Sequence, residues 1–226
     1  MVCDENHEAA LFNELGSSPA TLEGAKAVDC YGCLPGHVTE AADAKRAYTQ
    51  ALLGQLTPNG KPGADGADPC LVTTTTWVTL PKEVRPTDSR GRDLWRLRNI
   101  HDPVVPLVKA LYGHPDAGGY WERHCNAHLA KCGFEPIENW PSMFWAPKLQ
   151  LLLMVYVDDF KMSGPKASMA EGWKRISAGL DIDEPGPVDR CLGCHHHVAS
   201  GTVNGKPVQV MQYRVEQFME QCVVAY

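Results

Sequence analysis

Runs of apolar residues divide the chain into helices and β-hairpins. The clearest run is LQLLLMVYVDDFKMSG, residues 149–164, which predicts a strand, an acidic turn and a second strand. In the first strand Leu151 and Leu153 alternate with Leu152 and Met154, so that each set faces one side of a sheet. A buried strand that ends in two adjacent carboxylates is an unusual pattern, and it supplies the first candidate functional residues.

Helical spacing predicts helices over residues 18–32, 116–132 and 166–179, and a last helix over 213–226. In the second of these, Asp116 is the expected cap, Gly133 the expected end, and His128 a core residue rather than a ligand.

Residues 37–48 predict a strand that runs into a turn or short helix, and residues 71–80 a strand or hairpin arm. Asn204-Gly205 between two β-rich segments is a strong hairpin signal. Helices interleaved with antiparallel hairpins, without a βαβ rhythm, indicate the α+β class.

The composition is that of a folded globular protein, with 226 residues of which 44% are hydrophobic and 21% charged. The first residues lack a signal-peptide pattern, and no segment reaches the roughly 20 apolar residues that span a bilayer. We therefore expect an intracellular protein, cytoplasmic or nuclear, that is neither secreted nor bound to a membrane. Nine cysteines, an odd number, favour reduced thiols over a disulfide framework.

A basic segment interrupts an otherwise acidic chain. The net charge is −6, whereas residues 82–109 hold seven lysines and arginines against four acids, a local charge of +3. The segment is either a solvated surface or a phosphate-contacting face, for which Arg90, Arg92, Arg96 and Arg98 are the candidates. A Gly- and Pro-rich stretch, 55–69, is expected to form an exposed inserted loop.

The adjacent acids Asp158 and Asp159 repel each other, and a divalent cation shared with a third carboxylate would relieve that repulsion. Oxygen ligands of this kind suit Mg²⁺. Two such ions can stabilise the attacking and leaving oxygens of a phosphoryl transfer. An acidic pair alone is also typical of a simple hairpin turn, so a second match is required.

Four ordered blocks supply that match: Asp43-Ala44-Lys45-Arg46-Ala47-Tyr48, then Ala110-Leu111-Tyr112-Gly113 with Tyr120-Trp121-Glu122, then Tyr156-Val157-Asp158-Asp159, and last Cys191-Leu192-Gly193-Cys194. In the order and spacing of these blocks the sequence resembles the reverse transcriptase domain of copia-type retrotransposon polyproteins. The resemblance implies an RNA-directed DNA polymerase in which Asp43, Asp158 and Asp159 hold two Mg²⁺ ions, with Mn²⁺ as the alternative ion.

The same resemblance implies further roles. Tyr48 would act as a steric gate against a 2′-hydroxyl, and Tyr156 and Gly113 would contact the nucleotide. The partners would be template-primer nucleic acid, dNTPs and other parts of a retroelement polyprotein. The implied architecture is a palm over 37–190, preceded by partial fingers in 1–36 and followed by a primer-grip-like hairpin and the start of a thumb in 191–226.

Two features depart from the family. After Gly113 the chain has His114-Pro115-Asp116, where Leu-Lys-Gln is usual, and few residues precede Asp43. We therefore expect a fragment or a decayed copy, for which a folded remnant without activity is one outcome.

The cysteines provide a rival hypothesis, a non-catalytic nucleic-acid- or zinc-binding module. Cys30 and Cys33 form one Cys-x-x-Cys pair, and Cys191 and Cys194 form a second. Such pairs can hold zinc when they come together, but far apart in sequence they depend on the fold to do so. Otherwise they are incidental thiols.

Overall fold

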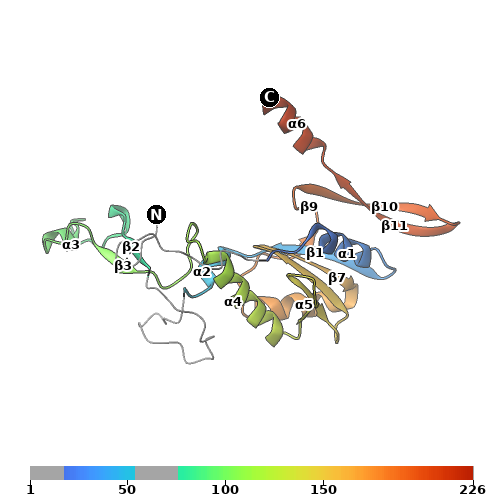
Figure 1. Cartoon of the computed structure of the whole chain (residues 1–226), viewed down its shortest axis with the longest axis horizontal. Helices are drawn as coiled ribbons and strands as arrows, with labels where there is room; N and C mark the ends of the chain where they lie inside the picture. Colours follow the sequence, from blue (N-terminus) through green and yellow to red (C-terminus); the bar gives the residue numbers. More distant parts are fainter. Residues whose placement is uncertain (1–17, 54–75, 226) are drawn as a thin grey trace.

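The computed structural model describes residues 18–53 and 76–225. Its largest element is a six-stranded antiparallel sheet in the order β4-β5-β6-β7-β1-β8 (Figure 1). The strands of this sheet are β1 (His37–Asp43), β4 (Glu135–Pro136), β5 (Met143–Ala146), β6 (Leu151–Tyr156), β7 (Asp159–Pro165) and β8 (Gly186–Pro187). The mixed α+β class with antiparallel sheets is therefore confirmed.

Helices cover both faces of this sheet. The main helices are α1 (Leu22–Gly32), α4 (Ala117–Lys131) and α5 (Lys166–Ser177), and the short α2 (Ala47–Gln50) follows β1. Helix α1 begins at Thr21, whose side chain accepts a hydrogen bond from the backbone N–H of Gly24 at 3.2 Å. This cap satisfies one of the free N–H groups of the first turn and so sets the start of the helix.

The alternation in β6 separates two apolar cores. Leu151 and Leu153 pack in the larger core with Trp121 of α4 and Trp173 of α5. Met154 packs on the other face in the core that includes α1. The expected alternation along this strand is confirmed, and it explains why nearly all of β6 is apolar: both faces of the strand are covered.

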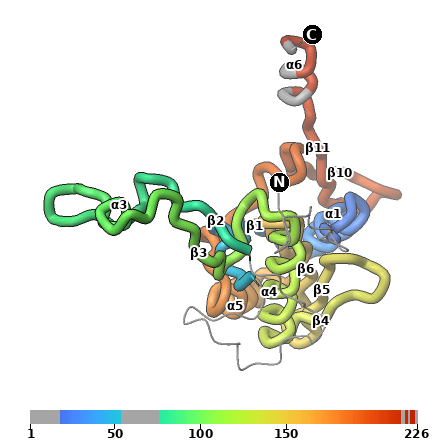
Figure 2. The backbone as a smooth tube through the Cα atoms, turned by 60° about the vertical axis from the view of Figure 1, so that its left-hand side comes forward, coloured from blue at the N-terminus to red at the C-terminus, as the bar shows by residue number. Residues whose placement is uncertain are grey.

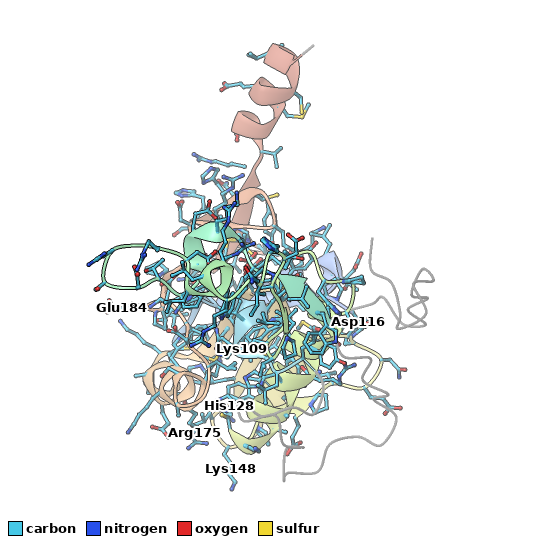
Figure 3. All side chains as sticks on the ribbon, turned by 90° about the vertical axis from the view of Figure 1, so that its left-hand side faces the viewer. Lys109, Asp116, His128, Lys148, Arg175 and Glu184 are labelled. Carbon is cyan, nitrogen blue, oxygen red and sulfur yellow. The ribbon has the colours of Figure 1, made fainter. Side chains whose placement is uncertain are left out.

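His128 is a satisfied core residue, as expected. Its Nε2 lies 2.8 Å from the backbone oxygen of Ile176, and Figure 3 shows His128 beside Arg175 at the α4–α5 contact. The cap prediction for α4 is only partly right: Asp116 occupies the N-cap position, but its side chain makes no capping hydrogen bond. Helix α4 is followed by Gly133 at φ +85°, as its predicted end requires.

An arm, residues 76–109, extends away from the sheet (Figures 1 and 2). It contains β2 (Trp77–Thr79), which pairs with β3 (Val104–Pro106), the 3-10 turn η1 (Lys82–Val84) and α3 (Leu94–Leu97). Its base is attached beside α2, because the N–H of Leu53 donates to the oxygen of Val108 at 2.8 Å. The predicted strand at 71–80 is thus an arm of a hairpin in its described part, and the predicted loop 55–69 lies outside the described residues.

A second hairpin follows the main sheet. Strands β10 (Cys194–Val203) and β11 (Lys206–Arg214) pair around Asn204-Gly205, both at positive φ, and the short β9 (Arg190–Cys191) pairs with β10. The hairpin prediction is confirmed. The last helix, α6 (Glu216–Ala225), begins after the expected position 213, because residues up to Arg214 remain paired in β11. No helix in the described part of the chain is both long and apolar enough to cross a membrane.

Candidate active site

The end of β1 and the start of β7 bring two acids face to face. Asp43, the last residue of β1, is the direct antiparallel partner of Asp159, the first residue of β7. Directly opposed residues in antiparallel strands have their side chains on the same face. Asp158 immediately precedes Asp159 in the turn between β6 and β7. The three acids predicted to act together, Asp43, Asp158 and Asp159 (the acidic cluster), are thus brought to one corner of the sheet.

The electrostatics of this corner are those of uncompensated negative charge. Burial raises the pKa of Asp159 to about 6, and the charges of Asp43 and Asp158 add to the effect, as does a hydrogen bond with the Asp43 side chain. Within residues 18–53 and 76–225, no lysine or arginine forms an ion pair with any of the three. Like charges this close raise the cost of ionisation, and an added cation would lower it.

The donor set of the acidic cluster suits a hard cation such as Mg²⁺, because all its ligands are carboxylate oxygens. The described residues nevertheless contain no group of three or more His, Cys, Asp or Glu side chains already arranged to hold a metal ion. The chemistry therefore fits Mg²⁺, while the ligand geometry stays a prediction.

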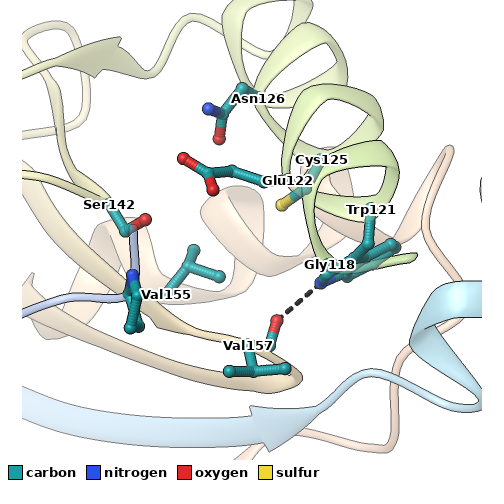
Figure 4. Close-up of a pocket in the computed structure, with 9 residues that line it drawn as sticks. Gly118, Trp121, Glu122, Cys125, Asn126, Ser142, Val155 and Val157 are labelled. Atoms are coloured by element: carbon teal, nitrogen blue, oxygen red, sulfur yellow. Dashed lines mark hydrogen bonds between the residues drawn. The ribbon is translucent and has the colours of Figure 1, made fainter. Parts of the chain in front are cut away.

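The turn that carries Asp158 has an unusual backbone. Val157 and Asp158 connect the two strands, and Val157 has φ +58°. A β-branched residue at positive φ is rare, and such strain costs on the order of 1–3 kcal/mol. The indole N–H of Trp121 on α4 donates to the backbone oxygen of Val157 at 2.6 Å (Figure 4). The sequence placed Trp121 on the apolar face of a helix but provided no sign of this contact.

A second backbone contact holds the other side of the turn. The N–H of Ala44, just after β1, donates to the oxygen of Asp158 at 2.7 Å. The oxygen of Asp43 in turn accepts from the N–H of Asp183 at 2.8 Å. The backbone oxygens of Asp43 and Asp158 are therefore both held by N–H groups of residues distant in sequence.

Two tyrosines stand beside the cluster. The rings of Tyr48 and Tyr112 lie 4.5 Å apart between centroids, inclined at 46°. The pKa of Tyr48 is raised, mainly by burial. The nearby negative charge of Asp158 and the Tyr112 side chain add smaller increases. Tyr48 is thus close enough to Asp158 for that carboxylate to affect the pKa of its phenol. Tyr112 precedes Gly113, which has φ +91°, and Tyr156 ends β6 opposite Asp159.

A second carboxylate lies on the same face of the sheet but has the opposite environment. Asp29 of α1 is fully buried, and its Oδ2 accepts from Lys161 Nζ at 2.9 Å and from the Tyr213 hydroxyl at 2.8 Å. Nε2 of His196 lies 3.3 Å from the same oxygen. This Asp29 network (Asp29, Lys161, His196 and Tyr213) joins α1 and β7 to the β10–β11 hairpin. It was not foreseen from the sequence, although a lysine in the apolar part of β7 was a visible anomaly.

The arginines of the arm differ in how far they are already neutralised. Arg92 pairs with Asp88 at 2.8 Å, whereas Arg90, Arg96 and Arg98 are exposed and form no ion pair within the described residues. Arg85 is nearly buried and holds the arm together, since it contacts Asp93 at 3.5 Å and donates to the oxygen of Leu80 at 3.0 Å.

The two Cys-x-x-Cys pairs lie on elements that meet, but they do not form a metal-holding group in the described part of the chain. Cys30 and Cys33 belong to the end of α1, and Cys191 and Cys194 flank the turn between β9 and β10. Burial raises the pKa of Cys191, which disfavours the thiolate that zinc requires. The zinc hypothesis therefore stays a prediction without direct support.

Comparison with known protein families gives one match. A family model described as "Reverse transcriptase (RNA-dependent DNA polymerase)" matches residues 96–221, just over half of the chain. The match includes Trp121, Asp158 and Asp159 but not Asp43 or Tyr48, which are related to it only through the strand pairing and contacts described above. A search of curated proteins found no match.

Proposed function

Because the chain belongs to the reverse transcriptase (RNA-dependent DNA polymerase) family, we propose that it carries the palm of a copia-type polymerase, with Asp43, Asp158 and Asp159 as its metal-binding acids. The observation that carries the proposal is the direct pairing of Asp43 with Asp159 beside Asp158, with no basic side chain paired to them in the described residues.

When bound, two Mg²⁺ ions would neutralise the phosphates of the nucleotide and the attacking oxygen of the primer. The protein's own contribution is to hold the three carboxylates together at one corner of the sheet, where their mutual repulsion favours the binding of a cation. Asp159 is the limiting group, because its pKa of about 6 leaves part of it protonated in mildly acidic solution. This pKa belongs to the metal-free site, so protonation of Asp159 competes with Mg²⁺, and at Mg²⁺ concentrations below saturation activity should rise as the pH increases through 6.

Nucleotide selection is assigned to Tyr48. Its ring is half-buried against Tyr112 and near Asp158, so it has little freedom to move aside. A fixed ring at the sugar of the incoming nucleotide would exclude a 2′-hydroxyl by steric contact. Tyr156 and Gly113 are assigned to the same nucleotide pocket.

Template and primer are assigned to the arm and the second hairpin. Arg90, Arg96 and Arg98 offer exposed charge for phosphates, and Arg92 offers less because Asp88 is already its partner. The domain scheme that follows is a palm over 37–190, partial fingers in 1–36, and a primer-holding hairpin with the start of a thumb in 191–226.

Primer extension tests the proposal. The full chain is incubated with an RNA template, a DNA primer, dNTPs and Mg²⁺, next to the variant Asp158→Asn. We expect extension by the unmodified chain and none by the variant. Extension that survives the substitution would overturn the metal assignment, and Mg²⁺ binding without extension would identify an inactive remnant.

Metal analysis of the purified protein distinguishes the alternative function, a zinc-binding module, from the polymerase. Purified protein that contains about one equivalent of zinc, and that loses thermal stability in a chelator, would favour the cysteine-based hypothesis over the polymerase. Protein free of zinc would remove it.

A further inference from the structure

The turn between β6 and β7 holds a conformation that its own residues do not favour. Val157 has φ +58°, in the left-handed region that β-branched side chains rarely adopt. Such a conformation persists where the surroundings hold it in place. The next residue is Asp158, so any relaxation of this turn would displace a carboxylate of the acidic cluster.

The contact that holds Val157 comes from α4. The indole N–H of Trp121 donates to the Val157 oxygen at 2.6 Å, and the residue as a whole is 2% exposed. Figure 4 shows Trp121 reaching from the helix to the turn, next to a pocket that Val155 and Cys125 also line. A buried N–H with a single fixed acceptor is a strong constraint, because leaving it unpaired is unfavourable.

The turn is thus held from two sides. Trp121 fixes the carbonyl of Val157, and the N–H of Ala44 fixes the carbonyl of Asp158 at 2.7 Å. The Ala44 contact follows directly from the pairing of β1 with β7, which includes Asp43 opposite Asp159. The Trp121 contact is independent of that pairing, since α4 is not part of the sheet.

We propose that Trp121 is a positioning residue for metal binding: its indole N–H holds the Val157–Asp158 turn and so sets where the carboxylates of Asp158 and Asp159 lie relative to Asp43. This inference rests on the proposed function, because it assigns Trp121 to the same acidic cluster. It predicts that the N–H matters for Mg²⁺ binding over and above what the indole ring contributes to the core.

The test compares two buried tryptophans. Trp121→Phe removes the N–H donor and keeps most of the apolar ring. Trp173→Phe is the matched control: Trp173 is 5% exposed in the same core, and its indole N–H donates to Glu40 of β1 at 2.8 Å and not to the turn. For each protein, Mg²⁺ is titrated and both the melting temperature and the rate of primer extension are followed.

We expect Trp121→Phe to raise the Mg²⁺ concentration needed for half of either effect by about 10- to 100-fold, the usual result of losing a group that orients a metal ligand. Trp173→Phe should lower the melting temperature without changing the Mg²⁺ requirement. Equal Mg²⁺ requirements in the two variants would overturn the inference, because Trp121 would then act only by packing.

A third variant makes the result specific to the turn. Asn tolerates positive φ, so Val157→Asn should relieve the strain. If Trp121 acts by holding this turn, adding Trp121→Phe to Val157→Asn should raise the Mg²⁺ requirement by less than it does in the unmodified chain. Full additivity would count against the proposal.

Failure of the inference and failure of the proposed function give different results. If the unmodified chain neither extends a primer nor shows a Mg²⁺-dependent melting shift, both fall. If it does both, but Trp121→Phe behaves like Trp173→Phe, only the role of Trp121 is lost.

Discussion

Two partly or fully buried carboxylates on one face of the sheet, Asp29 and Asp159, differ in whether a cation of the protein balances their charge. Asp159 begins β7, and Lys161, two residues later on the same face, pairs with the buried Asp29. Burial by itself acts to raise the pKa of both carboxyl groups. Around Asp29, however, a hydrogen bond from His196, the charge of Lys161 and the Tyr213 hydroxyl outweigh burial, and the pKa of Asp29 ends below its usual value. Around Asp159 the neighbours are further acids, and its pKa rises to about 6.

The difference shows that the partner, and not burial alone, decides what a carboxylate can do. Asp29 has its cation inside the protein, and its Oδ2 is saturated by three donors, so it serves to join α1, β7 and the second hairpin. The acidic cluster has no internal cation within the described residues, and its charge can be balanced only from outside. A site that binds metal must leave that balance incomplete in the free protein.

The largest expected effect breaks the acidic cluster. Asp159→Asn should reduce primer extension by at least about a thousand-fold, equivalent to about 4 kcal/mol of transition-state stabilisation. The same variant should fold at least as well as the unmodified chain, because it removes charge repulsion. Asp183→Asn is the control: this exposed acid lies near the site and pairs with Lys45 at 3.4 Å, and extension should be retained. Equal loss in both variants would contradict the assignment.

The Asp29 network should respond in the opposite way, through stability. Lys161→Met leaves the Asp29 carboxylate buried without its cation, and we expect unfolding by denaturant to show a loss of about 3–5 kcal/mol. The double variant Lys161→Met with Asp29→Asn removes both charges and should be more stable than the single variant. A double variant that is no better would indicate that Lys161 acts by packing alone.

The pH dependence of stability should separate the two acids. Asp159 has a raised pKa, so its protonated form is favoured by folding, and its contribution to stability is lost as the pH rises from about 4 to about 6. The full pKa difference would be worth about 3 kcal/mol, and solvent around this half-exposed group reduces our expectation to about 1 kcal/mol. The melting temperature of Asp159→Asn should lack this loss.

Asp29 has a lowered pKa, so its contribution is complete above its unfolded pKa of about 3.9 and disappears as the pH falls through the folded value. Because Asp29 is present in both proteins, the difference between the unmodified chain and Asp159→Asn isolates Asp159. A difference that does not change between pH 4 and 6 would refute the electrostatic account of the cluster.

The smallest expected effect concerns the arm, where Arg92 forms an ion pair and the neighbouring Arg96 does not within the described residues. Arg96→Ala should reduce the salt dependence of template-primer binding by about one unit of slope, the contribution of one phosphate contact. Arg92→Ala should change it less, because Asp88 already neutralises that side chain at 2.8 Å. Binding titrations at several salt concentrations measure both slopes, and equal slopes would show that the Asp88 pairing does not persist in solution.

Local patterns predicted much of the fold. Alternation along β6, the helical stripe of α4 and the turn signal at Asn204-Gly205 were each read correctly, because each depends on residues close in sequence. Two local details were wrong. The side chain of Asp116 does not cap α4, and β11 extends to Arg214, because pairing with β10 continues that far.

For the candidate site, the sequence by itself determined which side chains are available: two adjacent acids after a strand, a third acid upstream and a tyrosine five residues after it. Only the tertiary structure decided which groups meet. The register of β1 against β7 sets Asp43 opposite Asp159, and the packing of α4 brings the Trp121 N–H to Val157, 36 residues away. The Lys161–Asp29 pair joins residues 132 apart. Residue periodicity reports the direction of a side chain within its own element, whereas a partner across the fold depends on register and helix packing, which no local pattern encodes.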